Sequence, residues 1–171
     1  MLVDKFIEEY GTLDFGWFID SSIYDDIHSI EVEGNTLHCY LENGDLVIKA
    51  EFIQHEGKIQ MHGVMSYRNG DHIERYDHGM LHSETHPAVY IRDDEGVGEF
   101  WYYKDEHHRE GAPALIDYLP NGSLREEEWW KHGKKHRIDG PAVVSYVDGI
   151  VTNEEWWVDN KRQDIDLKSS F

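Results

Sequence analysis

The sequence contains few cysteine, proline and basic residues. It has one cysteine, Cys39, among 171 residues, so an internal disulfide framework is excluded and a reducing compartment is favoured. No apolar stretch approaches the roughly 18 residues of a membrane span. The first ten residues, MLVDKFIEEY, also lack the cationic and apolar segments of a signal peptide. We therefore expect a cytoplasmic protein that makes no contact with a membrane.

The charge of the chain is strongly negative. Sixteen Lys and Arg residues stand against 35 Asp and Glu residues, which gives a formal net charge of −19 at pH 7. Such a surface repels the phosphates of nucleic acids and anionic membranes. Direct nucleic-acid binding is therefore not expected, and a basic partner is favoured. Aromatic residues make up 13% of the chain, which argues against disorder and for β-structure.

Turn dipeptides recur along the chain at a regular interval. Their glycines, which are Gly44, Gly70, Gly96, Gly122 and Gly149, lie 26, 26, 26 and 27 residues apart. Asn-Gly and Asp-Gly between alternating segments predict tight β-hairpins, because both central residues need positive φ. A second family of turns lies between them, at Glu33-Gly34, Glu56-Gly57, His78-Gly79, Asp105-Glu106, His132-Gly133 and Asp159-Asn160. Each unit of the repeat is thus expected to hold two strands and two turns.

These patterns predict an all-β protein whose successive hairpins form one elongated antiparallel sheet. The array of about five units, each of 26–28 residues, should span residues 29–163. Residues 1–28 fall outside the repeat and are expected to cap it, with a helix over 2–10 and a strand over 15–19, because a repeat array needs its open end covered. Residues 164–171 are expected to form a C-terminal tail.

A cluster of His, Arg and Pro-Ala also recurs with the repeat. It is present in 107-HHREGAPA-114 and again in 132-HGKKHRIDGPA-142. Groups that recur at every unit interface favour a structural role, so we expect no catalytic residue and no enzyme activity. The twelve histidines are expected to bind no metal, since equivalent residues of successive units stand about 10 Å apart.

The spacing Trp130-x-x-Gly133-x-x-His136 is similar to the core of the MORN (membrane occupation and recognition nexus) repeat. The stretch 57-GKIQMHGVMSYRNG-70 resembles the same motif. The His-Arg-x-Asp-Gly-Pro-Ala variant resembles repeat proteins of tailed phages and large DNA viruses. The resemblance covers roughly residues 30 to 165 and implies successive β-hairpins in one antiparallel sheet.

Acidic runs near the turns give the first of two functional hypotheses. On a rigid sheet they would form a negative stripe that binds a basic protein and imitates the charge of nucleic acid. We expect a phage-encoded inhibitor of a nuclease or another defence component in the cytoplasm of the host cell. The carboxylates concerned are Asp93, Asp94, Glu95, Glu126, Glu127, Glu128, Glu154 and Glu155.

The second hypothesis uses the aromatic residues. A ladder of Trp101, Trp129 and Trp156 could stack a nucleobase-like small molecule, with Arg109 and Arg137 binding its phosphates. Neither hypothesis requires a cofactor. The sequence leaves open the identity of the partner and whether the chain forms a homo-oligomer.

Overall fold

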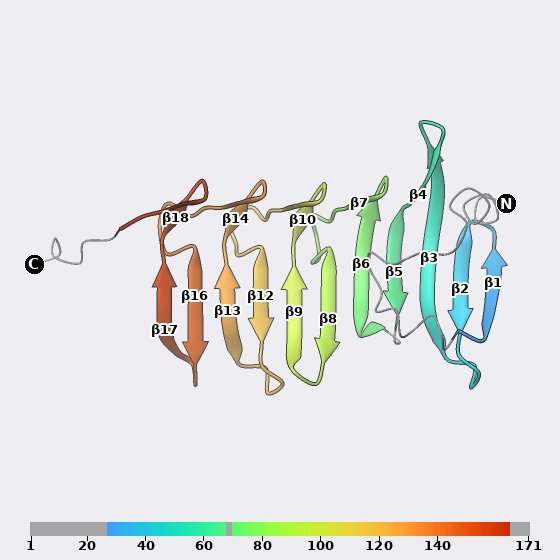
Figure 1. The fold of residues 1–171 in the computed structure, drawn as a ribbon, viewed down its shortest axis with the longest axis horizontal. Coiled ribbons are helices and arrows are strands. Elements are labelled where there is room, and N and C mark those ends of the chain that lie inside the picture. Colours follow the sequence, from blue (N-terminus) through green and yellow to red (C-terminus); the bar gives the residue numbers. More distant parts are fainter. Residues whose placement is uncertain (1–26, 68–69, 165–171) are drawn as a thin grey trace, which may run out of the picture. The chain divides into compact units, whose positions relative to one another are not determined.

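The computed structural model describes residues 27–67 and 70–164, which contain strands and turns but no α-helix (Figure 1). Successive strands pair antiparallel, which confirms the predicted all-β architecture of hairpins. The expected helix and strand of the N-terminal cap lie outside the described residues, as does the tail beyond Asp164. Among the residues described, no helix has the length and hydrophobicity needed to cross a membrane. The chain divides into two compact units, residues 1–80 and 81–171.

Within residues 27–67 and 70–80, the first unit contains five neighbouring strands and one short return strand. The neighbours are, in order, β1 (Ser29–Glu33), β2 (Thr36–Tyr40), β3 (Leu46–His55), β5 (Gly63–Tyr67) and β6 (His72–Asp77). The remaining strand, β4 (Lys58–Met61), folds back onto the far end of β3. The strand β7 (Met80–Leu81), which begins at the last residue of this unit, pairs with β6.

Large apolar side chains form the core of the first unit. On β2 and β3, Leu37 lies opposite Ala50 and Cys39 opposite Ile48, and all four are fully buried. Residues two apart on a strand share a face, so these pairs line one side of the sheet. Burial raises the pKa of the Cys39 thiol to about 11, which leaves it protonated and unreactive at neutral pH.

The second unit repeats a large hairpin followed by a short one. The large hairpins are β8 (Val89–Asp93) with β9 (Gly96–Phe100), β12 (Leu115–Tyr118) with β13 (Leu124–Glu128), and β16 (Val143–Val147) with β17 (Ile150–Glu155). The short hairpins are β10 (Tyr102–Tyr103) with β11 (Glu106–His107), β14 (Trp130–Lys131) with β15 (Lys134–Lys135), and β18 (Trp157–Val158) with β19 (Lys161–Arg162). Figure 1 shows the short hairpins at one end of the large ones.

The turns lie at the predicted glycines, with one shift. The prediction that both central residues have positive φ is confirmed at Asp148-Gly149 but is wrong at Asn43-Gly44 and Asn121-Gly122, where only the glycine has positive φ. Positive φ is found at all five repeat glycines, Gly44, Gly70, Gly96, Gly122 and Gly149. The short hairpins use two successive positive-φ residues, as at His132-Gly133 and Asp159-Asn160. In the hairpin of β10 and β11, however, these residues are Lys104 and Asp105. The predicted turn at Asp105-Glu106 is therefore wrong by one residue, because Glu106 already pairs with Tyr103.

Candidate functional site

A tryptophan follows each of the first two large hairpins and continues the sheet by one residue. The backbone N–H of Trp101 donates to the carbonyl of Ala114, and that of Trp129 donates to the carbonyl of Ala142, each at 2.7 Å. Both alanines are fully buried. Residues opposite each other in an antiparallel ladder share a face, so the small alanine side chain leaves space for the neighbouring indole.

The predicted loop arginines lie on these tryptophans. The Arg109 guanidinium is 3.7 Å from the centre of the Trp101 ring, and that of Arg137 is 3.8 Å from the centre of the Trp129 ring. Each arginine also donates to the carbonyl of the loop proline, Pro113 at 3.3 Å or Pro141 at 3.2 Å. A planar guanidinium on an indole is a favourable cation–π contact. The recurring arginine thus closes its own loop over the tryptophan.

The third predicted tryptophan, Trp156, lacks this arrangement. Gln163 donates its backbone N–H to the Trp156 carbonyl, as His136 does to Trp129. The next position, which is Arg137 in the preceding unit, holds the exposed Asp164. Within residues 81–164, the expected ligand set therefore forms two Trp–Arg pairs and a Trp156 without a stacked arginine.

A hollow of about 510 Å³ lies beside Trp101. Trp101 is only 8% exposed, and its indole Nε1 has no hydrogen-bond partner among the described residues. Because Arg109 covers the indole, a planar ligand could stack there only by displacing the guanidinium. The hollow is lined by Ser83, Glu84, Thr85, Trp101, Tyr103, His108, Arg109 and Glu110.

Two of the predicted binding carboxylates, Glu128 and Glu155, are held by a tryptophan and a cation. Glu128 accepts from the Trp130 indole at 2.7 Å and from Lys135 at 3.1 Å. Glu155 accepts from the Trp157 indole at 2.9 Å and lies 3.7 Å from Arg162. The Trp157 hydrogen bond is the main cause that lowers the pKa of Glu155. These two carboxylates therefore attach the short hairpins to the large ones.

The neighbouring aromatic residues Trp129 and Trp130 are both half-exposed, but their rings meet different groups. The Trp129 ring lies under Arg137. The Trp130 ring lies 5.3 Å from the His107 ring centre and 5.3 Å from the Lys135 ammonium. Trp129 continues the ladder of β13 by its bond to Ala142, whereas Trp130 begins β14 of a separate short hairpin, which accounts for the separate neighbours.

The Glu126-Glu127-Glu128 run does not lie on one face. Its residues are opposite Ser145, Val144 and Val143 respectively, so Glu127 points away from the other two. Glu126 accepts from the Ser145 hydroxyl and Glu127 from the Tyr146 hydroxyl, each at 2.9 Å. A single face that carries all eight predicted carboxylates is therefore not formed.

One row of carboxylates does share a face, and it includes a residue that the sequence reasoning missed. Glu99 and Glu127 both lie opposite Ile116, and Glu127 and Glu154 both lie opposite Val144. Every second strand therefore carries a glutamate, at a spacing of about 10 Å. The missed residue, Glu99, belongs to no acidic run but precedes Glu127 by 28 residues.

Tyrosines of the same sheet lie close to this row. The pKa of Tyr118 is raised by burial and further by the charges of Glu99 and Glu127. The pKa of Tyr146 is raised by burial, then by its hydrogen bond to Glu127 and by the charges of Glu127 and Glu154. We call Glu99, Glu127 and Glu154 with these two tyrosines the glutamate–tyrosine row.

The three carboxylates of the acidic turn Asp93-Asp94-Glu95 are exposed, and that of Asp93 also has a structural role. Asp93 Oδ1 accepts from the backbone N–H groups of Glu95 at 2.8 Å and Gly96 at 3.1 Å. The side chain thus closes the turn between β8 and β9, as aspartates commonly do. Asp94 and Glu95 are exposed.

Charge is distributed unequally between the large and the short hairpins of the second unit. Their sequences place eleven acidic and two basic residues in the large hairpins, but three acidic and six basic residues in the short ones. The lysines of the β14–β15 hairpin, Lys131, Lys134 and Lys135, contribute most to the difference. The unit therefore has an acidic part and a basic part along the strand direction.

Histidines pack beside the short hairpins. The His108 and His132 rings stack with centres 4.1 Å apart, and the His107 ring lies 4.2 Å from that of Tyr102. The pKa of His107 is lowered, chiefly by burial. The pKa of His108 is lowered by burial and by the neighbouring His132.

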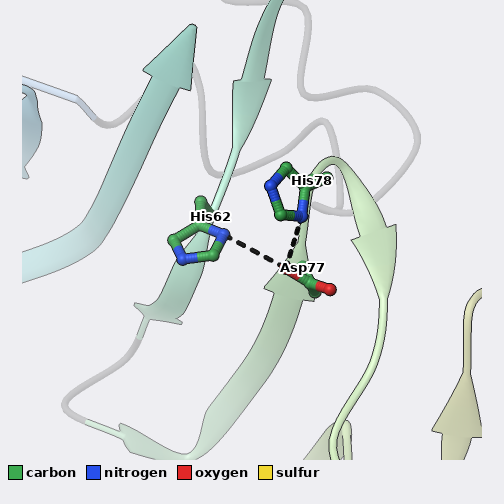
Figure 2. Close-up of side chains that lie close together, drawn as sticks. All are labelled: His62, Asp77 and His78. Carbon is green, nitrogen blue, oxygen red and sulfur yellow. Dashed lines mark ion pairs between the residues drawn. The ribbon is translucent and has the colours of Figure 1, made fainter. Parts of the chain in front are cut away.

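A second grouping, which the sequence analysis did not predict, lies in the first unit. His62, Asp77 and His78 bring their ligand atoms within 4.8 Å of one another (Figure 2). The expectation of no metal site was based on the distance between equivalent histidines of successive units. These three residues occupy non-equivalent positions.

Comparison with protein-family models, curated proteins and solved structures gives no match for this chain. The similarity to the MORN repeat stays a prediction.

Proposed function

We propose that the chain is a non-enzymatic protein-binding module whose large hairpins engage a basic partner protein. The observation that carries the proposal is the separation of charge in the second unit, where acidic residues gather on the large hairpins and lysines on the short ones. A basic surface would be attracted to one part of the unit and repelled by the other. Such an arrangement orients a partner before contact and speeds association.

Two groups of carboxylates remain available for a partner. They are those of the glutamate–tyrosine row and those of Asp94 and Glu95 in the turn between β8 and β9. In the described part of the second unit, Glu127 accepts from a tyrosine hydroxyl and has no cationic neighbour within ion-pair distance. Its charge is positioned but not neutralised. The adjacent Tyr118 and Tyr146 add side chains of a type enriched at protein interfaces. Lysines and arginines of a partner could pair with the glutamates and lie on the tyrosine rings.

The similarity to phage repeat proteins extends this proposal to a phage-encoded inhibitor. A nuclease or another nucleic-acid-binding defence component has a basic surface of the kind that the row would fit. Carboxylates about 10 Å apart would occupy part of that surface and compete with phosphates. The host-cell cytoplasm is the compartment in which such an inhibitor would act.

The proposal can be tested with two variants of equal charge. One replaces Glu99, Glu127 and Glu154 by Gln, and the control replaces Glu31, Glu33 and Glu42, which are exposed on the first unit. Proteins captured from a bacterial lysate by the wild-type chain would be identified, and association rates of the purified partner measured over a range of salt. We expect the row variant to associate at least about tenfold more slowly at low salt, with a flatter salt dependence, and the control to resemble wild type. Equal rates for all three proteins would contradict the proposal.

The Trp101 hollow supports a second candidate function, the binding of a small anionic molecule. The observation that favours it is the hollow beside Trp101, whose buried Nε1 has no hydrogen-bond partner among the described residues. Arg109 would then contact the anion instead of the indole. Titration of the chain with nucleoside mono- and diphosphates, followed by tryptophan fluorescence, tests this function. A saturable change that Arg109→Ala abolishes is the expected result, and an unchanged spectrum contradicts it.

A further inference from the structure

Two histidines and one aspartate of the first unit converge, although His62 is distant from the other two in the sequence. His62 Nδ1 lies 3.5 Å from Asp77 Oδ1, and His78 Nδ1 lies 2.6 Å from the same oxygen. Figure 2 shows the three side chains grouped where the chain leaves β4 and where β6 ends. One carboxylate oxygen thus stands between two imidazole nitrogens.

Backbone hydrogen bonds hold these three positions together. Gly63 pairs with Tyr76 in the ladder of β5 and β6, so the preceding residue, His62, lies across from Asp77 at the end of that ladder. The His62 N–H donates to the Glu51 carbonyl at 3.0 Å. On the other side, the Gly79 N–H donates to the Met61 carbonyl at 2.8 Å.

The conformation of His78 completes the group. Its φ of 51° lies in the left-handed region, as does that of His132 at the equivalent turn position, and His is one of the residue types enriched there. In this conformation His78 forms the first half of a tight turn and directs its ring toward Asp77. An ordinary turn residue at this position would leave the aspartate with one imidazole neighbour.

We propose that His62, Asp77 and His78 form a binding site for a divalent transition-metal ion of the zinc type. Two imidazoles and a carboxylate are ligands that Zn²⁺ takes readily, whereas Mg²⁺ and Ca²⁺ prefer oxygen ligands alone. In a tetrahedral zinc site the ligand atoms lie about 3.3–3.5 Å apart, given metal–ligand distances of about 2.0–2.1 Å. The separation of His62 from Asp77 matches this, and the His78–Asp77 contact needs to lengthen by less than about 1 Å.

The surroundings of the site favour occupation by an ion. His62 Nδ1 is inaccessible to solvent and has no hydrogen-bond partner among the described residues, whereas buried polar atoms ordinarily have one. The side chains as a whole stay 37–42% exposed, so an ion can enter from solvent. The His55 ring, with its centre 4.3 Å from that of His78, is one candidate for a fourth ligand. A water molecule is the other candidate.

Metal binding would strengthen the link between two segments, the exit from β4 and the turn after β6, which backbone hydrogen bonds and the His62–Asp77 ion pair already connect. Because the folded chain would bind the ion and the unfolded chain would not, zinc should raise the unfolding temperature of the first unit. Binding should also release protons, since the coordinating nitrogens must be free of them.

The test is titration of the metal-free full chain with Zn²⁺ by calorimetry, and with Co²⁺ by visible absorption. We expect one site per chain, an intense Co²⁺ spectrum of tetrahedral type, and little response to Mg²⁺. His62→Gln, Asp77→Asn and His78→Gln should each weaken Zn²⁺ binding at least about tenfold, because loss of even an outer-shell partner costs about 10- to 100-fold. The matched controls His38→Gln and Asp71→Asn, in the same unit, should bind as wild type.

A measurement on the wild-type chain keeps the proposal testable even if the variants fail to fold. In NMR spectra, the imidazole signals of His62 and His78 should shift first and together as Zn²⁺ is added. If other histidines respond first, or if the controls weaken binding as much as the site variants, the proposal is overturned. Weak uptake of several ions per chain would also overturn it, since this is the behaviour of scattered surface histidines and carboxylates.

Discussion

The two units of the molecule bury their side chains in different ways. The largest fully buried side chains, Phe52, Leu37, Ile48, Met65 and Cys39, all belong to the first unit. In the second unit the fully buried apolar residues are alanines, Ala88, Ala114 and Ala142, and two of them lie opposite tryptophans that arginines cover. The first unit thus depends on one local core, whereas the second distributes its stability over contacts that recur with each hairpin.

The largest expected effect is the loss of a core side chain from the first unit. Phe52 is 1% exposed, so Phe52→Ala should reduce the free energy of unfolding of that unit by about 4 kcal/mol, through lost burial and the cavity left behind. Hydrogen exchange should then become faster in β2, β3 and β5 but not in β12 to β17. Equal acceleration in both units would contradict the local-core description.

A smaller effect is expected from the corresponding change in the second unit. Trp101→Ala should cost about 3 kcal/mol, because it removes a mostly buried indole and the surface on which Arg109 lies. Loss of protection should be confined to the adjoining hairpins, β8–β9 and β12–β13, as expected for contacts between neighbours. Uniform loss across residues 89–155 would show that the repeats unfold as one.

Substitution of two turn glycines, Gly96 and Gly122, should distinguish the cost of backbone strain from the cost of a steric clash. A Cβ added to Gly96 would lie 1.8 Å from the Tyr118 carbonyl oxygen, whereas one added to Gly122 meets open space. Gly122→Ala should cost about 1 kcal/mol from positive φ alone, and Gly96→Ala roughly 2 to 3 kcal/mol. Chemical denaturation of both variants measures the difference. Equal values would imply that the turn of β8 and β9 can move away from Tyr118.

Arg137 should contribute modestly to the scaffold. Arg137→Ala removes the contact with the Trp129 ring and the hydrogen bond to Pro141, and should cost about 1 kcal/mol. Arg137→Lys should recover little of this, because an ammonium cannot stack as a planar guanidinium does. Thermal denaturation gives the comparison. Partner binding lost at unchanged stability would instead assign Arg137 to a binding site.

The smallest expected effect is a dependence of stability on pH through His107. Burial lowers the pKa of His107 in the folded state, so the unfolded chain takes up a proton more readily. Stability should therefore fall as the pH decreases from the ordinary histidine pKa of about 6.5 toward the lowered folded value. His107→Gln should flatten denaturation midpoints measured between pH 7.5 and pH 5, while the exposed His86→Gln should not. Identical profiles for these two variants would exclude His107 as a cause.

The repeat could be predicted from the sequence because its turns require particular residues. The five repeat glycines, four of them after Asn or Asp and Gly96 after Glu95, marked their turns correctly. The turn at Lys104 and Asp105 has positive φ without a glycine and was misplaced by one residue. Local pairing also explains the error over Glu126 to Glu128. A run of like residues suggests one patch, yet alternation along β13 divides it between two faces.

The His62–Asp77–His78 group could not be predicted in the same way. Reasoning from the repeat compares equivalent positions, which stay about two strands apart. Here a residue after β4 meets the last residue of β6 and the residue that follows it, because β5 returns the chain between them. The register of β5 with β6 brings the three side chains together, and backbone bonds from His62 and Gly79 hold them there. Glu99 was missed for a different reason. It occupies the position equivalent to Glu127 in the preceding repeat, but it is not part of a run of acidic residues, and the prediction considered only such runs.

The hydrogen bonds between successive hairpins have a consequence for engineering. Trp101 and Ala114 make the same backbone bonds as Trp129 and Ala142, at the same 2.7 Å, and the loop bonds from His108 and His136 to the preceding tryptophans are both 3.0 Å. A duplicated copy of residues 115–142 would therefore find the same backbone hydrogen-bond partners at both of its edge strands. Deletion of this segment would bring together two edge strands whose hydrogen-bonding groups match. We therefore expect that repeats can be added to or removed from the second unit without designing a new interface between hairpins.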